Sequence, residues 1–278
     1  MLKIFRVVIA TTLRCNLDCK LCFPKAPLLK HPWHPDTAYL KAELDRIFSI
    51  IDSCGRLDLS GGEPLLRTDL HEVLSHALQY ISRMDDGIRI ITNGTIVPNS
   101  KIIDACKAYH GRIEFLVDNY GTDVSTKIKE ISHVLDEADI RYSIRNNDPN
   151  SPHCGGWVDL GIERGKRNSP EKAQELFQHC ICNDELRYAG AIEAGRQYIC
   201  KMSKLVTLAG WEPDRPEEYV DLMDMSKSAE DLRAELNELY NRPCIAACQY
   251  CNGFFHDSPR FAPGVQMTPE EKEAAKKF

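Results

Sequence analysis

The sequence contains no apolar run of the length that crosses a membrane and no secretory signal. Its first fifteen residues are strand-like, and no small-residue cleavage site precedes the first motif. Lys and Arg form no block, and the formal net charge is -6. A nucleic-acid partner normally requires a basic face, so the charge pattern argues against one. We therefore predict a cytoplasmic protein without a membrane or nucleic-acid partner.

The twelve cysteines are many for a cytoplasmic protein of 278 residues. Because that compartment is reducing, their number does not indicate a disulfide framework. Metal or redox chemistry is the remaining explanation, and the spacing discussed below predicts metal binding for at least six of them. Cys54 and Cys106, on predicted helices, are interpreted as small buried apolar side chains.

Strand and helix patterns alternate along the first part of the chain. Such alternation with short connections predicts an α/β fold with a parallel sheet or barrel. The predicted strands cover 3–12, 56–60, 88–92, 112–118 and 140–144, with a further strand near 156–162. The predicted helices start after Asp36 and Asp69 and cover 99–109 and 123–138, and another begins at Ser169-Pro170.

The character of the chain changes near residue 177, because six cysteines fall between 180 and 251. We predict one domain over 1–177 and a small Cys-rich domain over 178–278. In the second, the pattern predicts a hairpin that turns at Gly195. It also predicts helices over 229–240 and 269–277, the last with a capping box.

The first cysteine group is Cys15-x3-Cys19-x2-Cys22, directly after the first strand. Three thiolates can hold three irons of a [4Fe–4S] cluster, which leaves the fourth iron open to a small molecule. A structural zinc site is the alternative, with His31 or His34 as its fourth ligand.

This triplet resembles the CxxxCxxC signature of the radical S-adenosylmethionine (SAM) superfamily. Ser60-Gly61-Gly62-Glu63-Pro64, after the second strand, resembles the GGE motif of that family. The resemblance implies that Gly61 and Gly62 let the backbone approach the methionine part of SAM and that Glu63 accepts from its amino group. Asn93, in Thr92-Asn93-Gly94 after the third strand, is implied to point toward SAM or substrate, or it is a turn residue.

The resemblance extends to the ends of the next two strands. It implies that Asn119 or Asp118 lies near the SAM ribose and that Arg145 lies near the SAM carboxylate. The implied fold is a partial (β/α)6 barrel over about residues 1–165. The implied chemistry is the reductive cleavage of SAM to a 5′-deoxyadenosyl radical, with a flavodoxin- or ferredoxin-type electron donor.

The second cysteine group resembles the SPASM and shortened twitch extensions of radical SAM enzymes. It reads Cys182-x12-Gly195-x4-Cys200, followed by Cys244-x3-Cys248-x2-Cys251. The resemblance implies an auxiliary [4Fe–4S] cluster in a small C-terminal auxiliary-cluster domain. Its four implied ligands are Cys182, Cys200, Cys248 and Cys251. Cys180 and Cys244 are then spare; Cys244 either replaces Cys248 or acts as a catalytic thiol that returns a hydrogen atom to a substrate radical. A zinc ribbon is the alternative for this region.

Two substrate classes compete. The size and the twitch-like tail resemble the 2-deoxy-scyllo-inosamine dehydrogenases and related carbohydrate-modifying radical SAM enzymes, which implies oxidation or epimerisation of a sugar or aminocyclitol. The alternative is a maturase of a ribosomally made peptide, which the early start of the barrel disfavours. An iron–sulfur carrier does not explain the GGEP motif. The side chains that can hold a hydroxylated ligand are Tyr120, Arg145, Asn147, Trp157, Asp159 and Arg187.

Overall fold

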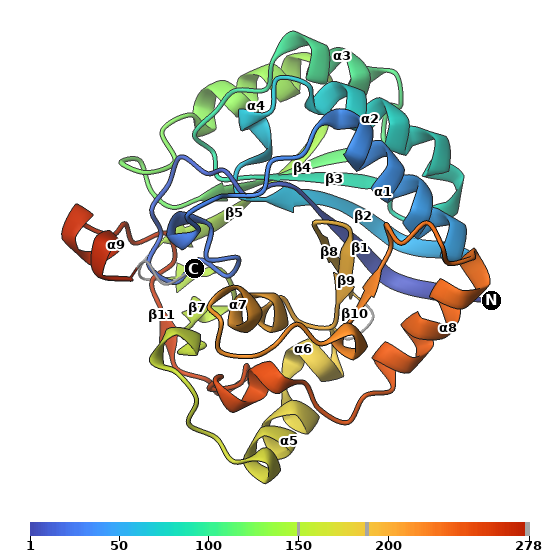
Figure 1. Cartoon of the computed structure of the whole chain (residues 1–278). Helices are drawn as coiled ribbons and strands as arrows, with labels where there is room; N and C mark the ends of the chain where they lie inside the picture. Colours follow the sequence, from blue (N-terminus) through green and yellow to red (C-terminus); the bar gives the residue numbers. More distant parts are fainter. Residues whose placement is uncertain (149–150, 187–188, 276–278) are drawn as a thin grey trace.

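The computed structural model describes residues 1–148, 151–186 and 189–275. Its central feature is a curved, mostly parallel sheet (Figure 1). In the described residues its strands follow the order β10-β9-β8-β1-β2-β3-β4-β5-β6. Their bounds are β1 (Lys3–Thr12), β2 (Ser53–Gly61), β3 (Ile88–Thr92), β4 (Ile113–Asn119), β5 (Arg141–Asp148), β6 (Ser151–Pro152), β8 (Ala189–Glu193), β9 (Arg196–Tyr198) and β10 (Tyr219–Asp221).

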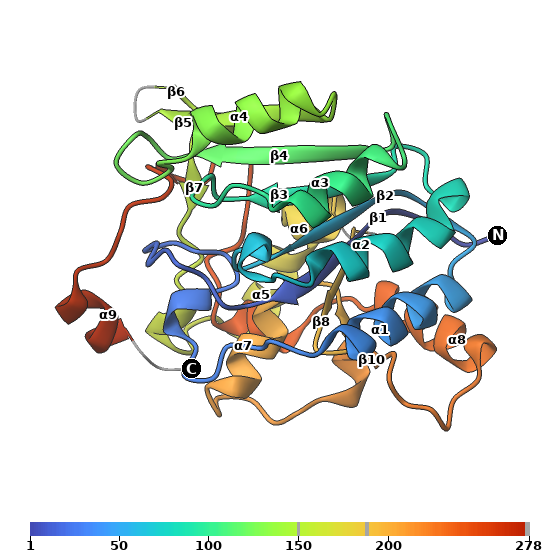
Figure 2. The same cartoon turned by 90° about the horizontal axis from the view of Figure 1, so that it is seen from above.

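Four helices connect the first five strands and cover the outer face of the sheet (Figures 1 and 2). They are α1 (Thr37–Ile50), α2 (Leu70–Ala77), α3 (Ser100–Lys107) and α4 (Ile128–Glu137). Asp36 caps α1 by accepting from the Tyr39 N–H at 2.7 Å, as its sequence position predicts. Leu40, Leu44 and Ile47 recur at helical spacing and are fully buried against the strands, so apolar burial fixes α1 to the sheet.

The predicted strand–helix alternation and the partial barrel are confirmed, but the sixth parallel strand is not where the chain order suggested. No parallel strand follows β5 beside it in the described residues. The segment near 156–162 forms only β7 (Trp157–Val158), which pairs with β11 (Arg260–Phe261) in a separate antiparallel sheet. The sixth parallel strand is β8, which pairs with the other side of β1, with Val8 opposite Ala191.

Of the remaining helices, α5 (Pro170–His179), α6 (Ile181–Asp184) and α7 (Met202–Leu208) lie on the concave side of the sheet (Figure 1). The helix α8 (Ala229–Tyr240) packs beside α1 and β10, and α9 (Pro269–Ala275) lies at the opposite outer edge. The hairpin β8–β9 turns at Ala194-Gly195, as predicted. β8 follows residue 177 and pairs with β1, so one sheet contains strands from both sides of the predicted boundary. The division into domains at that point stays a prediction.

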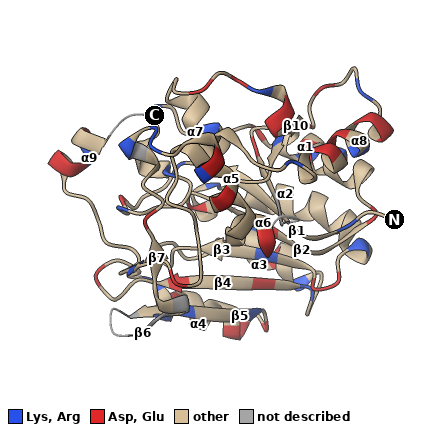
Figure 3. Ribbon diagram, turned by 90° about the horizontal axis from the view of Figure 1, so that it is seen from below, with Lys and Arg blue, Asp and Glu red and all other residues tan. Residues whose placement is uncertain are grey.

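Acidic and basic side chains are interspersed over the elements (Figure 3). Among the described residues, no helix is both long and apolar enough to cross a membrane.

Candidate active site

One cavity of about 460 Å³ lies on the concave side of the sheet. Its walls come from the inner faces of β1 to β5, from the loop after β1, and from the segment around β8 and β9. Five cysteines line it: Cys15, Cys19, Cys22, Cys182 and Cys200. The two cysteine groups, far apart in the sequence, thus contribute to the same cavity.

In the first triplet, Cys19 is buried, and Cys15 and Cys22 are half-buried at this cavity. Burial raises the pKa of Cys19 to about 12 and that of Cys22 to about 11, and it also raises the pKa of Cys15. Two side-chain amides point at the sulfurs: Asn93 Nδ2 lies 3.7 Å from Cys15 Sγ, and Gln266 Nε2 lies 3.2 Å from Cys19 Sγ. N–H groups aimed at sulfur suit thiolate ligands, and metal binding to such thiols displaces their protons.

The GGEP turn is tied to the cysteine loop through the backbone. Gly62 N donates to Thr12 O at 2.7 Å, and Glu63 N donates to Arg14 O at 2.9 Å. Gly61 has a φ of +130° and lies against the Thr12 carbonyl. Both glycines line the cavity. Their predicted role in letting the backbone approach SAM stays a prediction.

Glu63 makes several hydrogen bonds within the chain at the end of β2. The side chain is fully buried and does not line the cavity. Its carboxyl accepts from Leu65 N at 2.9 Å, Thr92 Oγ1 at 2.9 Å and Asn93 N at 2.7 Å. Burial raises its pKa to about 7. Glu63 thus ties the end of β3 to the end of β2. Its acceptance from the SAM amino group stays a prediction.

Asn93 stands at the cavity wall, as predicted. Its Nδ2 donates to Asn16 Oδ1 at 3.0 Å, and its Oδ1 accepts from the Thr95 hydroxyl at 2.6 Å. The backbone N–H of Asn93 donates to the Glu63 carboxyl. Asn93 is therefore both a turn residue and a cavity residue, and a contact with SAM or substrate stays a prediction.

The ends of β4 and β5 present Asp118 and Arg145 to the cavity. Their side chains pair with each other, with Arg145 Nη2 2.7 Å from Asp118 Oδ2. Asn119 does not line the cavity; it bonds to Asn146 on β5 at 2.9 Å. Strand alternation explains this, because adjacent residues point to opposite faces. Of the two predicted ribose neighbours, only Asp118 is at the cavity.

Of the other predicted polar residues, some line the cavity and others do not. Tyr120 and Trp157 line the cavity and pack edge to face, with ring centroids 5.6 Å apart. Asn147 and Asp159 do not line it; Asp159 forms an ion pair with Arg164. Arg187 and the side chain of Cys154 lie outside the part that the structure describes.

The second cysteine group converges in space. The thiols of Cys180 and Cys200 lie close enough to Cys182 to raise its pKa. The charges of Cys248 and Cys251 lie close enough to Cys200 to interact with it. Asn168 orders the loop between them, because its Nδ2 donates to the carbonyls of Cys248 and Cys251, each at 2.8 Å.

Cys244 contacts Cys248 and donates to the Ile245 carbonyl at 3.4 Å, but it does not line the cavity. The role of Cys244 as a hydrogen-atom donor to substrate stays a prediction. Within residues 1–148, 151–186 and 189–275, no three His, Cys, Asp or Glu side chains are grouped tightly enough for a single metal ion. A cubane cluster spreads its ligands over its corners, so the cysteine groups fit a cluster through their donor type and their convergence.

The C-terminal segment contributes a residue that the sequence did not suggest. Residues 265–267 pair with the cysteine loop, through Lys20 N to Val265 O and Met267 N to Asp18 O, each at 2.8 Å. Gln266 lies between these bonds; its Oε1 accepts from Asp18 N at 2.7 Å. The helix α9 that follows lies beyond the cysteine loop (Figure 2). A lone Gln far from any motif carries no sequence signal.

We expect Gln266→Leu to lower the reduction potential of a cluster held by Cys19. The change removes an N–H donor to sulfur, and such donors stabilise the reduced cluster. A hydrogen bond of about 1 kcal/mol corresponds to roughly 40 mV for one electron. An EPR-monitored redox titration measures the shift. Thr268→Ala, in the same segment but without a sulfur contact, serves as the control, and an equal potential in Gln266→Leu and wild type contradicts the assignment.

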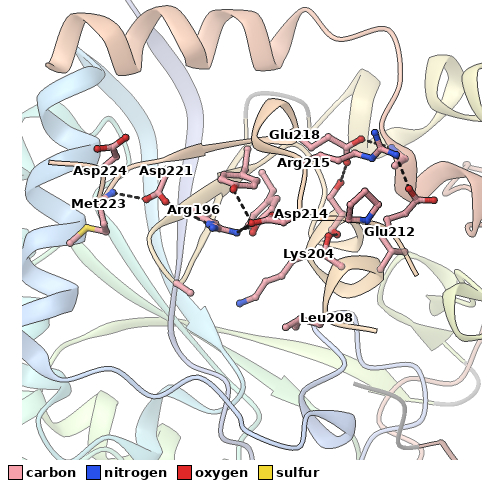
Figure 4. A pocket seen from close by; sticks show the side chains of 18 of the residues that line it. Arg196, Lys204, Leu208, Glu212, Asp214, Arg215, Glu218, Asp221, Met223 and Asp224 are labelled. Atoms are coloured by element: carbon pink, nitrogen blue, oxygen red, sulfur yellow. Dashed lines mark hydrogen bonds and ion pairs between the residues drawn. The ribbon is translucent and has the colours of Figure 1, made fainter. Parts of the chain in front are cut away.

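A second cavity of about 540 Å³ lies beside β9, β10 and α7 (Figure 4). Its charged side chains pair mainly with each other, as Arg196 with Asp214 and Arg215 with Glu212. Glu218 accepts from Ala246 N at 2.6 Å and so supports the loop that carries Cys244 and Cys248. This cavity is lined by none of the predicted site residues.

Comparison with known proteins agrees with this arrangement. Residues 9–138 match the model of the radical SAM superfamily. A GTP 3',8-cyclase of Campylobacter lari is 26% identical over 151 residues, which are 50% of this chain and 44% of that protein. A GTP 3',8-cyclase of Syntrophomonas wolfei is 32% identical over 139 residues, which are 49% of this chain and 40% of that protein. The chain thus spans less than half of the length of these curated relatives.

Two solved structures resemble the whole chain in fold. BtrN in complex with AdoMet and 2-DOIA has a TM-score of 0.53 at 17% identity and covers 94% of this chain and 99% of its own. Native anSMEcpe with bound AdoMet has a TM-score of 0.52 at 11% identity and covers 99% and 96%. At these identities the likeness concerns the fold alone.

Proposed function

We propose that this chain, whose residues 9–138 match the model of the radical SAM superfamily, is a radical SAM enzyme that abstracts a hydrogen atom from a small hydroxylated substrate, a sugar or an aminocyclitol. The observation that carries the proposal is the shared cavity, which Cys15, Cys19 and Cys22 line together with Cys182 and Cys200. A substrate in that cavity lies within reach of both cysteine groups.

The residues available for cofactors follow from the geometry. The first triplet would hold the SAM-binding [4Fe–4S] cluster, and Cys182, Cys200, Cys248 and Cys251 would hold the auxiliary one. Gly61, Gly62, Asn93 and the Asp118–Arg145 pair would bind SAM at the ends of the strands. When bound, the first cluster supplies the electron that divides SAM into methionine and a 5′-deoxyadenosyl radical, and the second accepts the electron that the substrate loses after hydrogen abstraction.

Oxidation fits the site better than epimerisation. In oxidation the substrate would lose one hydrogen atom to the 5′-deoxyadenosyl radical, then one electron to the cluster that the second cysteine group would hold and one proton to solvent, and a C–OH group would become a ketone. Epimerisation requires a hydrogen-atom donor in the cavity, and Cys244 is not there. The electron that starts each turnover would come from a flavodoxin- or ferredoxin-type donor.

The substrate class rests on the cavity. A space of about 460 Å³, walled by the Tyr120–Trp157 pair, suits a small molecule. Among the structural neighbours, BtrN was solved with 2-DOIA, whereas anSMEcpe was also solved with a peptide. A peptide maturase is therefore the second candidate, and the GTP 3',8-cyclase relatives add a nucleotide to the compounds to be tested.

The test is an anaerobic incubation of the reduced protein with SAM and carbon-deuterated aminocyclitols, sugars, GTP or a short peptide. The proposal expects deuterium in 5′-deoxyadenosine and a ketone product with an aminocyclitol or a sugar. Transfer of deuterium only from GTP or only from the peptide would contradict it. Recovery of an epimer in place of a ketone would reject oxidation.

A further inference from the structure

Below the predicted SAM site, three arginines surround one carboxylate on the inner face of β1 to β3. Asp58 is fully buried, and its Oδ1 accepts from Arg56 Nε at 2.9 Å and from Arg89 Nε at 3.1 Å. Its Oδ2 accepts from Arg89 Nη2 at 3.0 Å, and Arg6 Nη1 lies 3.6 Å from the same oxygen. One negative charge is thus shared by three positive charges.

Arg6 is the least satisfied of the three. Its Nε is buried and has no hydrogen-bond partner in the described part of the chain. Burial lowers the pKa of Arg6, Asp58 raises it, and the charges of the neighbouring arginines lower it again. A guanidinium nevertheless stays protonated in proteins, so Arg6 carries an under-compensated charge into a low-dielectric site. A buried donor without a partner is destabilising, and an incoming acceptor removes that cost.

The charged residues that line the cavity include more basic than acidic side chains, which also favours an anionic ligand. Arg145 is paired with Asp118, and Lys201 lies 3.8 Å from Glu193. Arg6 and Arg89 have only the shared Asp58 among the charged groups that line the cavity with them. The charged lining residues are Arg6, Arg89, Arg145, Lys201 and Arg260 against Asp58 and Asp118.

The position of these groups separates them from the SAM site. Asp58 lies three residues before Gly61 on β2, and Arg89 lies three residues before Thr92 on β3. At about 3.3 Å per residue, the arginines are about 10 Å deeper than the strand ends. On the neighbouring strand Ala191, which lies opposite Val8, presents only a methyl group to the cavity.

We propose that the substrate carries a carboxylate or phosphate group, which Arg6 and Arg89 bind at the floor of the cavity. The planar guanidinium fork suits both oxyanions. Anchoring this end leaves the hydroxylated end of the substrate near the strand ends, where hydrogen abstraction would occur. The inference rests on the proposed function, because it assumes that the substrate occupies this cavity.

The experiment titrates inorganic phosphate and, separately, malonate into the reconstituted, SAM-loaded holoprotein by anaerobic calorimetry. We expect saturable binding of at least one, and the tighter of the two identifies the oxyanion. Arg6→Gln should weaken that binding by about tenfold or more, since it removes a charge-assisted contact. Arg56→Gln is the matched control, because Arg56 contacts the same carboxylate but does not line the cavity; its affinity should stay within about threefold.

Three results would overturn the inference: neither anion binds the wild type, Arg6→Gln binds as tightly as the wild type, or Arg56→Gln loses as much affinity. Iron content and circular dichroism verify each variant, and Arg89→Gln replaces Arg6→Gln if the latter does not fold. The same wild-type preparation is assayed for 5′-deoxyadenosine from SAM. Absence of that product defeats the proposed function, whereas its presence without anion binding defeats only this inference.

Discussion

Cys15→Ala is expected to abolish the formation of 5′-deoxyadenosine from SAM by the reduced protein. Three thiolates hold the SAM-binding cluster in this account, and loss of one leaves too few ligands to retain it with an open iron. Iron should fall from about eight to about four per chain, because the second cysteine group keeps its own cluster. Anaerobic reconstitution followed by iron analysis and chromatography of the products measures both values.

Cys106→Ala is the matched control. Cys106 is a buried thiol on α3 that packs in the core and lies at neither cysteine group. It should retain about eight irons and full SAM cleavage, at a modest cost in stability. Wild-type amounts of 5′-deoxyadenosine from Cys15→Ala would disprove the assignment of the triplet.

Gly62→Ala is expected to disrupt the predicted SAM site through the backbone. A Cβ at this position would lie 2.2 Å from Arg14 O and 2.7 Å from Arg14 C, both of which are backbone atoms. The loop that carries Cys15 must then move away from the GGEP turn, and the bonds from Gly62 N and Glu63 N are lost or strained. We expect a loss of roughly 2–4 kcal/mol in stability and of most SAM binding. Calorimetric titration with SAM and thermal unfolding under anaerobic conditions measure the two effects.

Gly111→Ala is the control that separates the steric clash of a new Cβ from the effect of replacing a glycine as such. Gly111 has a φ of +74°, and a Cβ there meets no atom within 4 Å. Its cost should be about 1–2 kcal/mol from the backbone conformation alone, with SAM binding unchanged. If Gly62→Ala binds SAM like Gly111→Ala, the close approach of the turn to the cysteine loop has no role in the site.

Local signals predicted most of the barrel. The β-branched run of 3–12 forms β1 with the expected bounds, and 229–240 forms α8 as expected. The placement of β8 beside β1 was not predictable, because the two strands are about 180 residues apart and no local pattern specifies which strands pair. The helix expected over 123–138 begins only at Ile128, since residues before it form turns that bond to Gly121 and Gly94.

The sequence could predict which residues lie at the cavity where these residues belong to a motif. The cysteine triplet, the two glycines and Asn93 all lie at the cavity. Glu63 and Asn119 were assigned by resemblance, and neither lines the cavity. The Glu63 carboxyl already accepts three hydrogen bonds within the chain, and the Asn119 side chain lies on the opposite face of its strand. The position of Arg6 could have been predicted from the sequence, because it is a charged residue inside an apolar strand and shares a strand face with Val8.

The most direct test of the central claim is the amount of 5′-deoxyadenosine and methionine formed from SAM by the anaerobically reconstituted, reduced wild-type protein. The account predicts equimolar amounts of the two products, from a protein that holds about eight irons per chain. Intact SAM after prolonged incubation with a fully iron-loaded, reduced protein would contradict it.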